Sequence, residues 1–160
     1  MKMTNALAAA ANNALRTALN GGRLYYFSGS VPAEAGDALD MASDHTQLVE
    51  FTIDGAGTTG LTFATSDGTV LSKNGAETWS GLVAFSGTGA GSATLTPTFF
   101  RFCPSGDNGR GASTGARIQG TIGGPASTAE LKLTDGTTVT DNGSNTRSLP
   151  VFNVELLLLS

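Results

Sequence analysis

The sequence predicts a mainly β protein: an antiparallel β-sandwich or jelly-roll that follows a short N-terminal α-helix. Charged residues make up only 14% of the 160 residues, and 22 residues are Gly. Soluble domains carry about 25% charged residues, so this surface must consist largely of Thr, Ser, Asn and Gly. Short β-branched and aromatic runs recur about every ten residues, with turn residues between them. We therefore divide the chain into an N-terminal helix, residues 1–22, and a single β-sandwich domain, residues 23–160.

The N-terminal segment has the pattern of an amphipathic helix. Its larger apolar positions recur every four residues and predict one narrow stripe: Leu7, Ala11, Leu15 and Leu19. Thr4 or Asn5 can cap the first turn, because their side-chain oxygens accept from unpaired N–H groups. Asn-Gly-Gly at 20–22 supplies a glycine for the left-handed position after the last turn.

A secretory signal peptide is the alternative for this segment, since Lys2 precedes an Ala-rich stretch. Signal peptides need an uninterrupted apolar run. Asn12 and Asn13 interrupt the run here, and the spacing of the Leu residues is helical. We therefore favour the structural helix.

After Gly22 the apolar period changes to two, which is the period of a strand. Strands are predicted at 23–27, 48–53, 61–64, 69–71, 78–85, 93–102, 116–122, 129–133, 137–140 and 151–159. Pro97 lies within the sixth and predicts an edge or a bulge, because proline donates no ladder hydrogen bond. Residues 29–44 are predicted to form an acidic loop, and residues 104–115 a Gly-rich loop that we expect to be mobile.

Charge and composition limit the partners. The formal net charge is −4 at pH 7, which disfavours nucleic acid, because affinity for phosphates comes from clustered Lys and Arg. No apolar run approaches the ~20 residues that span a bilayer. One Cys excludes an intrachain disulfide, and one Cys with one His is too few for a structural zinc site. We therefore expect no nucleic acid, membrane or metal partner and no cofactor.

Few residues suggest catalysis, and each has a simpler structural interpretation. His45 beside Asp44 could form a base and carboxylate pair, but no serine nucleophile context accompanies them. The 106–111 segment resembles a phosphate loop only in composition. Cys103 has no nearby His partner and suits a small apolar role. The Asp-Gly pairs lack calcium-loop spacing and are typical of turns: 54–55, 67–68 and 135–136. We predict no catalytic, cofactor-binding or metal-binding residues and no enzyme.

Aromatic residues occur in pairs, at Tyr25-Tyr26 and Phe99-Phe100. Neighbouring residues of a strand face opposite sides of the sheet, so both faces of these strands need apolar cover. One face can be the core, and the other can be a second layer or a subunit contact. Trp79 is interpreted as a core residue, and the alternatives are an interface anchor and a sugar-binding platform of Tyr25, Tyr26 and Trp79.

The C-terminal run of four leucines suggests assembly. In a strand, two of the four would face away from the core, and an exposed apolar edge promotes aggregation. We therefore expect cover from the N-terminal helix or from a neighbouring subunit. The predicted interface has three parts, in the helix, the Gly-rich loop and the C-terminal run: Leu7, Leu15 and Leu19; Asn108 and Arg110; Leu157 and Leu159.

Several segments occur in a defined order along the chain. An Ala-rich helix ends at Gly-Gly (21–22) and continues into RLYYFSG at 23–29. The later segments are VPA at 31–33, GSAT at 91–94, FRF at 100–102, ARIQGTIG at 116–123 and LPVF at 149–152. Together they resemble the small head-decoration (cement) or minor capsid proteins of tailed bacteriophages. The segment 40–47 is more polar than that pattern.

The resemblance implies a β-sandwich or jelly-roll protomer that binds outside the capsid shell as a small oligomer. We therefore expect a virion structural protein that stabilises a phage head, located on the capsid surface and assembled in the host cytoplasm. Its expected partners are the major capsid protein and further copies of itself, as a dimer or trimer. The alternative is a β-sandwich carbohydrate- or receptor-binding module of a phage tail or fibre.

Overall fold

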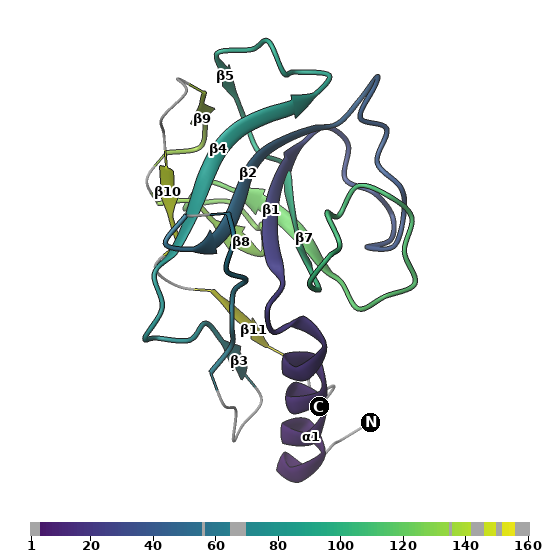
Figure 1. Cartoon of the computed structure of the whole chain (residues 1–160), viewed down its shortest axis with the longest axis vertical. Coiled ribbons are helices and arrows are strands. Elements are labelled where there is room, and N and C mark those ends of the chain that lie inside the picture. Colours follow the sequence, from purple (N-terminus) through teal and green to yellow (C-terminus); the bar gives the residue numbers. More distant parts are fainter. Residues whose placement is uncertain are drawn as a thin grey trace.

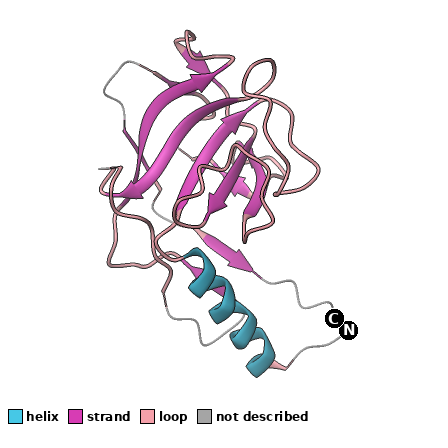
Figure 2. Ribbon diagram, turned by 45° about the vertical axis from the view of Figure 1, so that its right-hand side comes forward, coloured by secondary structure: helices cyan, strands magenta, loops and turns pink. Residues whose placement is uncertain are grey.

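In a computed structural model, one helix precedes a strongly curled seven-stranded sheet, and two small two-stranded sheets lie beside it (Figures 1 and 2). The structure describes residues 4–55, 57–64, 70–134, 136–141, 146–149 and 152–155. The predicted mainly β class with an N-terminal helix is confirmed. No helix in these ranges is long and apolar enough to cross a membrane.

Helix α1 spans Asn5–Leu19, and the strands follow it along the chain. They are β1 (Arg23–Ser28), β2 (Thr46–Ile53), β3 (Val70–Ser72), β4 (Trp79–Gly87), β5 (Thr94–Leu95), β6 (Phe99–Cys103), β7 (Ile118–Gly123), β8 (Leu131–Lys132), β9 (Val139–Thr140), β10 (Thr146–Ser148) and β11 (Asn153–Glu155). The large sheet has the order β10-β4-β2-β1-β6-β7-β8, and the small sheets are β11-β3 and β5-β9.

The large sheet is mixed, because β7 and β8 run parallel whereas its other neighbouring strands are antiparallel. The expectation of a purely antiparallel arrangement is wrong at this pair. The connection between them turns at Gly124, whose carbonyl accepts from Ser127 N at 3.0 Å. The chain then returns beside Gly123, whose carbonyl accepts from Leu133 N at 2.8 Å.

Helix α1 begins and ends where the sequence predicts. Thr4 is the cap, and its Oγ1 accepts from Leu7 N at 3.3 Å. Gly21 follows the last turn with a φ of 78°, a left-handed conformation that glycine adopts without steric cost.

The buried face of α1 differs from the predicted stripe. Ala8, Asn12 and Leu19 are fully buried, whereas Leu7 is 54% exposed. A helical turn has 3.6 residues, so a strict four-residue spacing drifts by about 40° at each step. Over three steps the stripe that includes Leu19 rotates away from Leu7, and Ala8 takes its place.

The main core lies on the inner face of the curled sheet. At its centre four aromatic rings pack with centroid separations of 4.9 to 6.2 Å: Phe63, Trp79, Phe102 and Phe152. Trp79 is fully buried, which confirms its interpretation as a core residue. Burial of large aromatic side chains is the main stabilising contribution available to a chain that is rich in Gly and Ala.

Some predicted strands differ in extent. The predicted 93–102 strand is divided into β5 and β6 around Pro97, and residues 61–64 form only isolated bridges at Leu61 and Phe63. Strand β11 lies within the predicted 151–159 strand, of which residues 151 and 156–159 lie outside the described ranges. Strand β10 was not predicted, because its Thr-Arg-Ser sequence has no apolar alternation.

Glu77 holds the turn before Trp79 and supplies a test of this part of the fold. Its carboxylate accepts from Thr62 N at 3.0 Å, Trp79 Nε1 at 2.8 Å and Asn74 Nδ2 at 3.2 Å, and from the Thr62 hydroxyl. Burial by itself would raise the pKa of Glu77, but the bonds from Thr62, Trp79 and Asn74 outweigh burial and lower it.

We expect Glu77→Gln to lower the free energy of unfolding by about 1–3 kcal/mol near neutral pH. The lowered pKa stabilises the fold fully above pH 4.5, and this contribution fades as the pH falls through the folded pKa. The difference between wild type and variant should therefore shrink in acid. Urea unfolding followed by Trp79 fluorescence measures it, with Glu34→Gln, an exposed loop carboxyl, as the control. If the difference in unfolding free energy between wild type and Glu77→Gln were the same in acid as at neutral pH, this account would be contradicted.

Candidate functional site

Two loops cover the outer face of the sheet, opposite to the main core. They span residues 29–45 and 104–117 and lie side by side over β1 and β6 (right-hand side of Figure 1). A second apolar cluster lies beneath them: Tyr25, Phe27, Leu39, Phe99 and Cys103. The second layer that the paired aromatics require is thus supplied at these strands by the chain itself.

Arg101 joins the two loops to the sheet. It is fully buried on β6, and its Nη1 donates to Asp37 O and to Gly109 O, both at 2.8 Å. Its Nη2 donates to Glu34 O at 3.3 Å, and its Nε to Gln119 Oε1 at 2.8 Å. Burial and the nearby Arg117 lower the pKa of Arg101, but a guanidinium stays charged in proteins.

A second arginine anchors the Gly-rich loop from within. Arg117 forms a two-pronged ion pair with Asp107, with Nε–Oδ2 and Nη2–Oδ1 distances of 2.7 Å. The hydrogen bonds from Arg117 lower the pKa of Asp107. Arg117 Nη1 also donates to Ala35 O in the other loop at 3.2 Å. The loop that we expected to be mobile is therefore tied to the sheet and to the acidic loop at several points.

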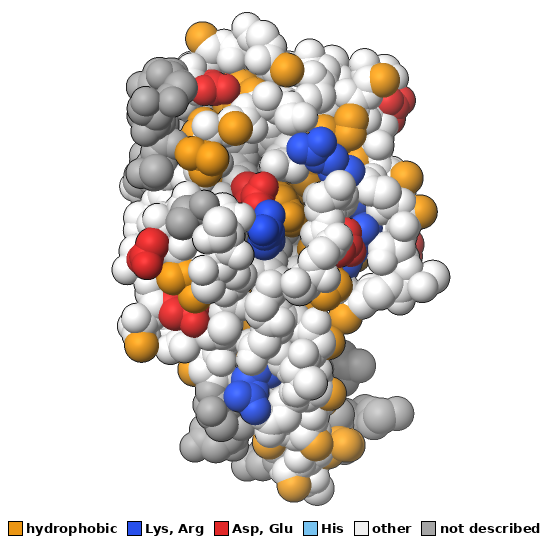
Figure 3. All heavy atoms as spheres, viewed as in Figure 1, with side chains coloured by type: hydrophobic (Ala, Val, Ile, Leu, Met, Phe, Trp, Pro, Cys, Tyr) orange, Lys and Arg blue, Asp and Glu red, His pale blue; other side chains and the backbone are white. Residues whose placement is uncertain are grey.

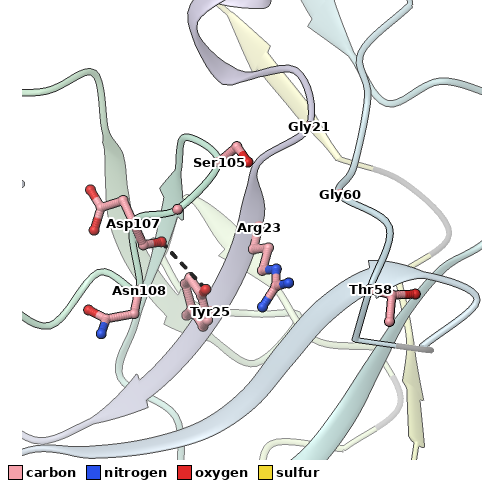
Figure 4. A pocket seen from close by; sticks show the side chains of 9 residues that line it. Gly21, Arg23, Tyr25, Thr58, Gly60, Ser105, Asp107 and Asn108 are labelled. Atoms are coloured by element: carbon pink, nitrogen blue, oxygen red, sulfur yellow. Dashed lines mark hydrogen bonds between the residues drawn. The ribbon is translucent and has the colours of Figure 1, made fainter.

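A polar hollow of about 180 Å³ opens beside these loops (Figure 4). It lies between the end of α1, the start of β1 and two loop segments. Its lining comes from Gly21, Arg23, Tyr25, Thr58, Gly60, Ser105, Gly106, Asp107 and Asn108. Figure 4 shows the Arg23 guanidinium pointing toward Thr58, and the Asp107 carboxylate pointing away from the hollow.

Arg23 and Tyr25, which line the hollow, have partners within the chain. Arg23 is paired with Glu50, and its Nη2 donates to Gly57 O at 2.8 Å. Burial and the neighbouring Glu50 raise the pKa of Tyr25 to about 12. The Tyr25 hydroxyl therefore stays protonated at neutral pH and donates toward Asp107 O at 3.5 Å.

The predicted interface residues are found in different surroundings. Leu7 is exposed at the end of α1 that is far from the sheet, Leu15 is partly buried against the core, and Leu19 is fully buried. Leu19 therefore offers no surface to a partner in this conformation. Leu157 and Leu159 lie outside the described residues.

Asn108 and Arg110 form an ordered tip on the Gly-rich loop. Asn108 is exposed, and its Oδ1 accepts from Arg110 N at 3.0 Å. Arg110 Nε donates to Gln47 Oε1 at 3.1 Å, and Arg110 O accepts from Leu39 N at 2.7 Å. These contacts fix the turn against Gln47 of β2 and Leu39 of the other loop.

His45 lies beside Asp44 and Ser30, but the order of contacts does not suit nucleophilic catalysis. Ser30 donates its hydroxyl to Asp44, not to His45. His45 Nε2 lies 2.9 Å from Ser30 O and 3.5 Å from Asp44 Oδ2. A catalytic triad needs the imidazole between the hydroxyl and the carboxylate. Here the three residues close the base of the acidic loop, and His45 packs edge-on against Phe99.

The other residues considered for chemistry have structural surroundings. Burial raises the pKa of the Cys103 thiol to about 12, so the nucleophilic thiolate is scarce in the folded protein. Asp54 has a φ of 57°, as expected for a turn. Asp67 and Asp135 belong to pairs with residues outside the described ranges. Within those ranges, no group of three or more His, Cys, Asp and Glu side chains is placed to hold a metal ion.

The proposed aromatic platform for sugars is wrong. Tyr25, Tyr26 and Trp79 are 3%, 1% and 0% exposed, so none of them presents a ring face to solvent.

Arg101 is the important residue that sequence reasoning missed. Its signal is present in the sequence, because one cation stands among aromatic residues in FFRFC at 99–103. A buried cation needs several acceptors, but the acceptors are mostly backbone carbonyls from other segments, and no sequence pattern marks those.

Comparisons of the chain with models of protein families, with curated proteins and with solved structures gave no significant match.

Cys103 is a built-in reporter of the Arg101 contacts, because its sulfur lies beneath the 104–117 loop. Arg101→Lys keeps the charge but loses the planar fork. We expect it to lower the free energy of unfolding by about 2 kcal/mol or more. We also expect thiol labelling of Cys103 under native conditions to become about tenfold faster or more, because the loops open more often.

Arg110→Lys is the matched control, since Arg110 lies on the same loop and its side chain makes one hydrogen bond, to Gln47. It should change stability by about 0.5 kcal/mol or less. Equal labelling rates in the Arg101 and Arg110 variants would show that the Arg101 fork does not hold the loop.

Proposed function

We propose that this chain is a virion structural protein, a decoration or cement protein that binds the outer surface of a phage head and stabilises it. The observation that carries the proposal is the exposed side of α1, which has no charged residue. The phage itself is suggested by the resemblance of the segment order to head-decoration and minor capsid proteins.

Helix α1 projects from the sheet (Figures 1 and 2). Its exposed positions are Ala6, Leu7, Ala10, Ala14, Thr17 and Ala18. A helix side that faces only water normally carries charged residues, whereas Arg16, the one charged residue of α1, is partly buried. In Figure 3 the helix region at the lower end of the molecule shows mainly apolar and uncharged groups.

This side of the helix suits close contact with another protein. Alanine and threonine let two backbones approach closely, and Leu7 provides one larger apolar side chain. No ion has to be desolvated, so the contact avoids the cost of burying an unpaired charge. We propose the major capsid protein as the partner, with self-association of the chain as a dimer or trimer. Many weak copies on one shell would add up through multivalency.

The proposal includes a β-sandwich or jelly-roll class for residues 23–160. Support comes from the main core, which joins Leu71 of β3 and Val139 of β9 to the inner face of the large sheet. In this interpretation the two small sheets form part of a second layer.

Two experiments test the proposal. Mass spectrometry of purified mature particles should detect this chain, and its absence from them would exclude the function.

The second experiment measures binding of the added protein to shells that lack the chain. Leu7→Glu should weaken this binding about tenfold or more, since burying a Leu contributes roughly 1.5–3 kcal/mol. Leu82→Glu on β4 is the matched control, because Leu82 is 46% exposed but lies on the sheet. Equal losses in both variants would exclude α1 as the contact.

A carbohydrate- or receptor-binding module is the second candidate, and the polar hollow supports it. The hydroxyls of Tyr25, Thr58 and Ser105 can exchange hydrogen bonds with a small polar ligand. A glycan array tests this candidate, with Ser105→Trp as the variant that fills the hollow and Ser113→Trp as the control. We expect binding that only Ser105→Trp abolishes. An array without any bound glycan would exclude the carbohydrate module.

A further inference from the structure

Asn-Gly pairs are the sequences most prone to spontaneous deamidation, because glycine leaves its own N–H unhindered. The described residues contain three such pairs, at 20–21, 74–75 and 108–109. We propose that Asn108 is a site of self-catalysed deamidation, at which the surrounding loop promotes conversion to aspartate and isoaspartate. The inference does not depend on the proposed function.

The reaction needs only this chain and water. Gly109 N attacks Asn108 Cγ and forms an N–C bond, which closes a five-membered succinimide. The Cγ–Nδ2 bond breaks, and the proton lost by Gly109 N leaves with Nδ2 as ammonia. Water then opens the ring at either carbonyl, which gives aspartate or isoaspartate. No oxidant, reductant or cofactor takes part.

Three features at Asn108 favour the first step. Gly109 N donates to Asp107 Oδ1 at 2.8 Å, so a carboxylate is positioned to receive its proton. Arg110 N donates to Asn108 Oδ1 at 3.0 Å and polarises the carbonyl that is attacked. Asn108 is exposed, and solvent can accept the departing ammonia.

The Arg117 pair fixes the position of this carboxylate. Both Asp107 oxygens accept from Arg117 at 2.7 Å, so the side chain cannot rotate away from Gly109. The hydrogen bonds from Arg117 also lower the pKa of Asp107, so its carboxylate is ionised at neutral pH and keeps an oxygen on the Gly109 N–H.

The other two pairs lack this arrangement. Gly21 N donates to the Leu61 carbonyl at 2.9 Å, and a carbonyl takes no proton at neutral pH. Asn20 Oδ1 accepts from Phe63 N at 2.9 Å, so its carbonyl is polarised as at Asn108, and what this pair lacks is the carboxylate beside the glycine N–H.

At the Asn74-Gly75 pair, hydrogen bonds hold the amide nitrogen that would have to leave as ammonia. Asn74 Nδ2 donates to Thr62 Oγ1 at 3.0 Å and to Glu77 Oε1 at 3.2 Å. Its Oδ1 accepts from Ala76 N at 3.1 Å, the same contact that Asn108 Oδ1 has with Arg110 N, so the two pairs differ in the hydrogen bonds to Nδ2 and not in the polarised carbonyl. Asn20 and Asn74 thus serve as internal controls with the same Asn-Gly sequence.

The product changes the loop tip. A neutral amide becomes a carboxylate beside Arg110, and the isoaspartate form adds a methylene group to the backbone before Gly109. Since Gly109 O accepts from Arg101, the longer backbone also disturbs the contact that holds this loop.

Peptide mapping by mass spectrometry of the folded protein, incubated at neutral pH, tests the proposal. We expect Asn108 to convert about tenfold faster or more than Asn20 and Asn74. In denaturant the three rates should become similar, because only the sequence then acts. Equal rates in the folded protein, or a preference for Asn108 that persists in denaturant, would overturn the proposal.

Asp107→Asn tests the carboxylate. This variant keeps an acceptor for Gly109 N but removes the proton acceptor, and conversion of Asn108 should slow about tenfold. Asp40→Asn, on the other loop, is the matched control and should leave the rate unchanged. An unchanged rate in Asp107→Asn, with Asn20 and Asn74 still slow as a sign of an intact fold, would exclude Asp107. If that variant unfolds, Asn20 and Asn74 accelerate too, and the comparison of folded and denatured wild type decides.

Discussion

The buried guanidinium of Arg101 determines how the outer face of the sheet is covered. A cation without water needs acceptors around it, and Arg101 finds three carbonyl oxygens in the two loops and one side-chain oxygen on β7. From these loops only Leu39 and Met41 pack in or against the second apolar cluster, so apolar packing alone would hold the loops weakly. The hydrogen bonds of the Arg101 guanidinium hold both loops on the outer face of the sheet. The loops in turn cover the second apolar cluster, and the 104–117 loop forms one wall of the hollow.

The two faces of this sheet are thus stabilised in different ways. Inside the curl, large aromatic side chains pack on one another in the main core. Outside, a small cluster lies beneath two polar loops that are held by arginines. Adjacent aromatics such as Tyr25 and Tyr26 contribute one ring to each face, and register explains this, since Tyr25 lies opposite Arg101 while Tyr26 lies opposite Phe100. A subunit contact is not needed to cover Tyr25, because the chain covers it.

Local chemistry explains which parts of this structure are predictable. The Thr4 cap and Gly21 act over a few residues, and strand periodicity is a local property as well, so the start and end of α1 and the positions of β1, β2 and β4 follow from sequence. Leu7 shows the limit of counting positions, because a four-residue spacing only approximates the helical period. The hydrogen bonds by which Arg101 holds the two loops are not predictable, because most of their acceptors are main-chain oxygens of residues distant in sequence. The interface role of Asn108 and Arg110 stays a prediction, and the turn that holds them depends on contacts with Asp107, Gln47 and Leu39, which the sequence does not mark.

The exposed apolar residues do not all carry the same information. The large ones in the described ranges are Leu7, Val31, Val70 and Leu82, and they come from α1, the acidic loop, β3 and β4. Single exposed apolar residues are common on soluble proteins and need no partner to explain them. Leu7 differs because its neighbours on the exposed side of α1 are uncharged and small. Among the described residues, the apolar surface that suggests assembly therefore lies on one side of α1, and the sheet, whose two faces are largely covered by described parts of the chain, has less need of a partner.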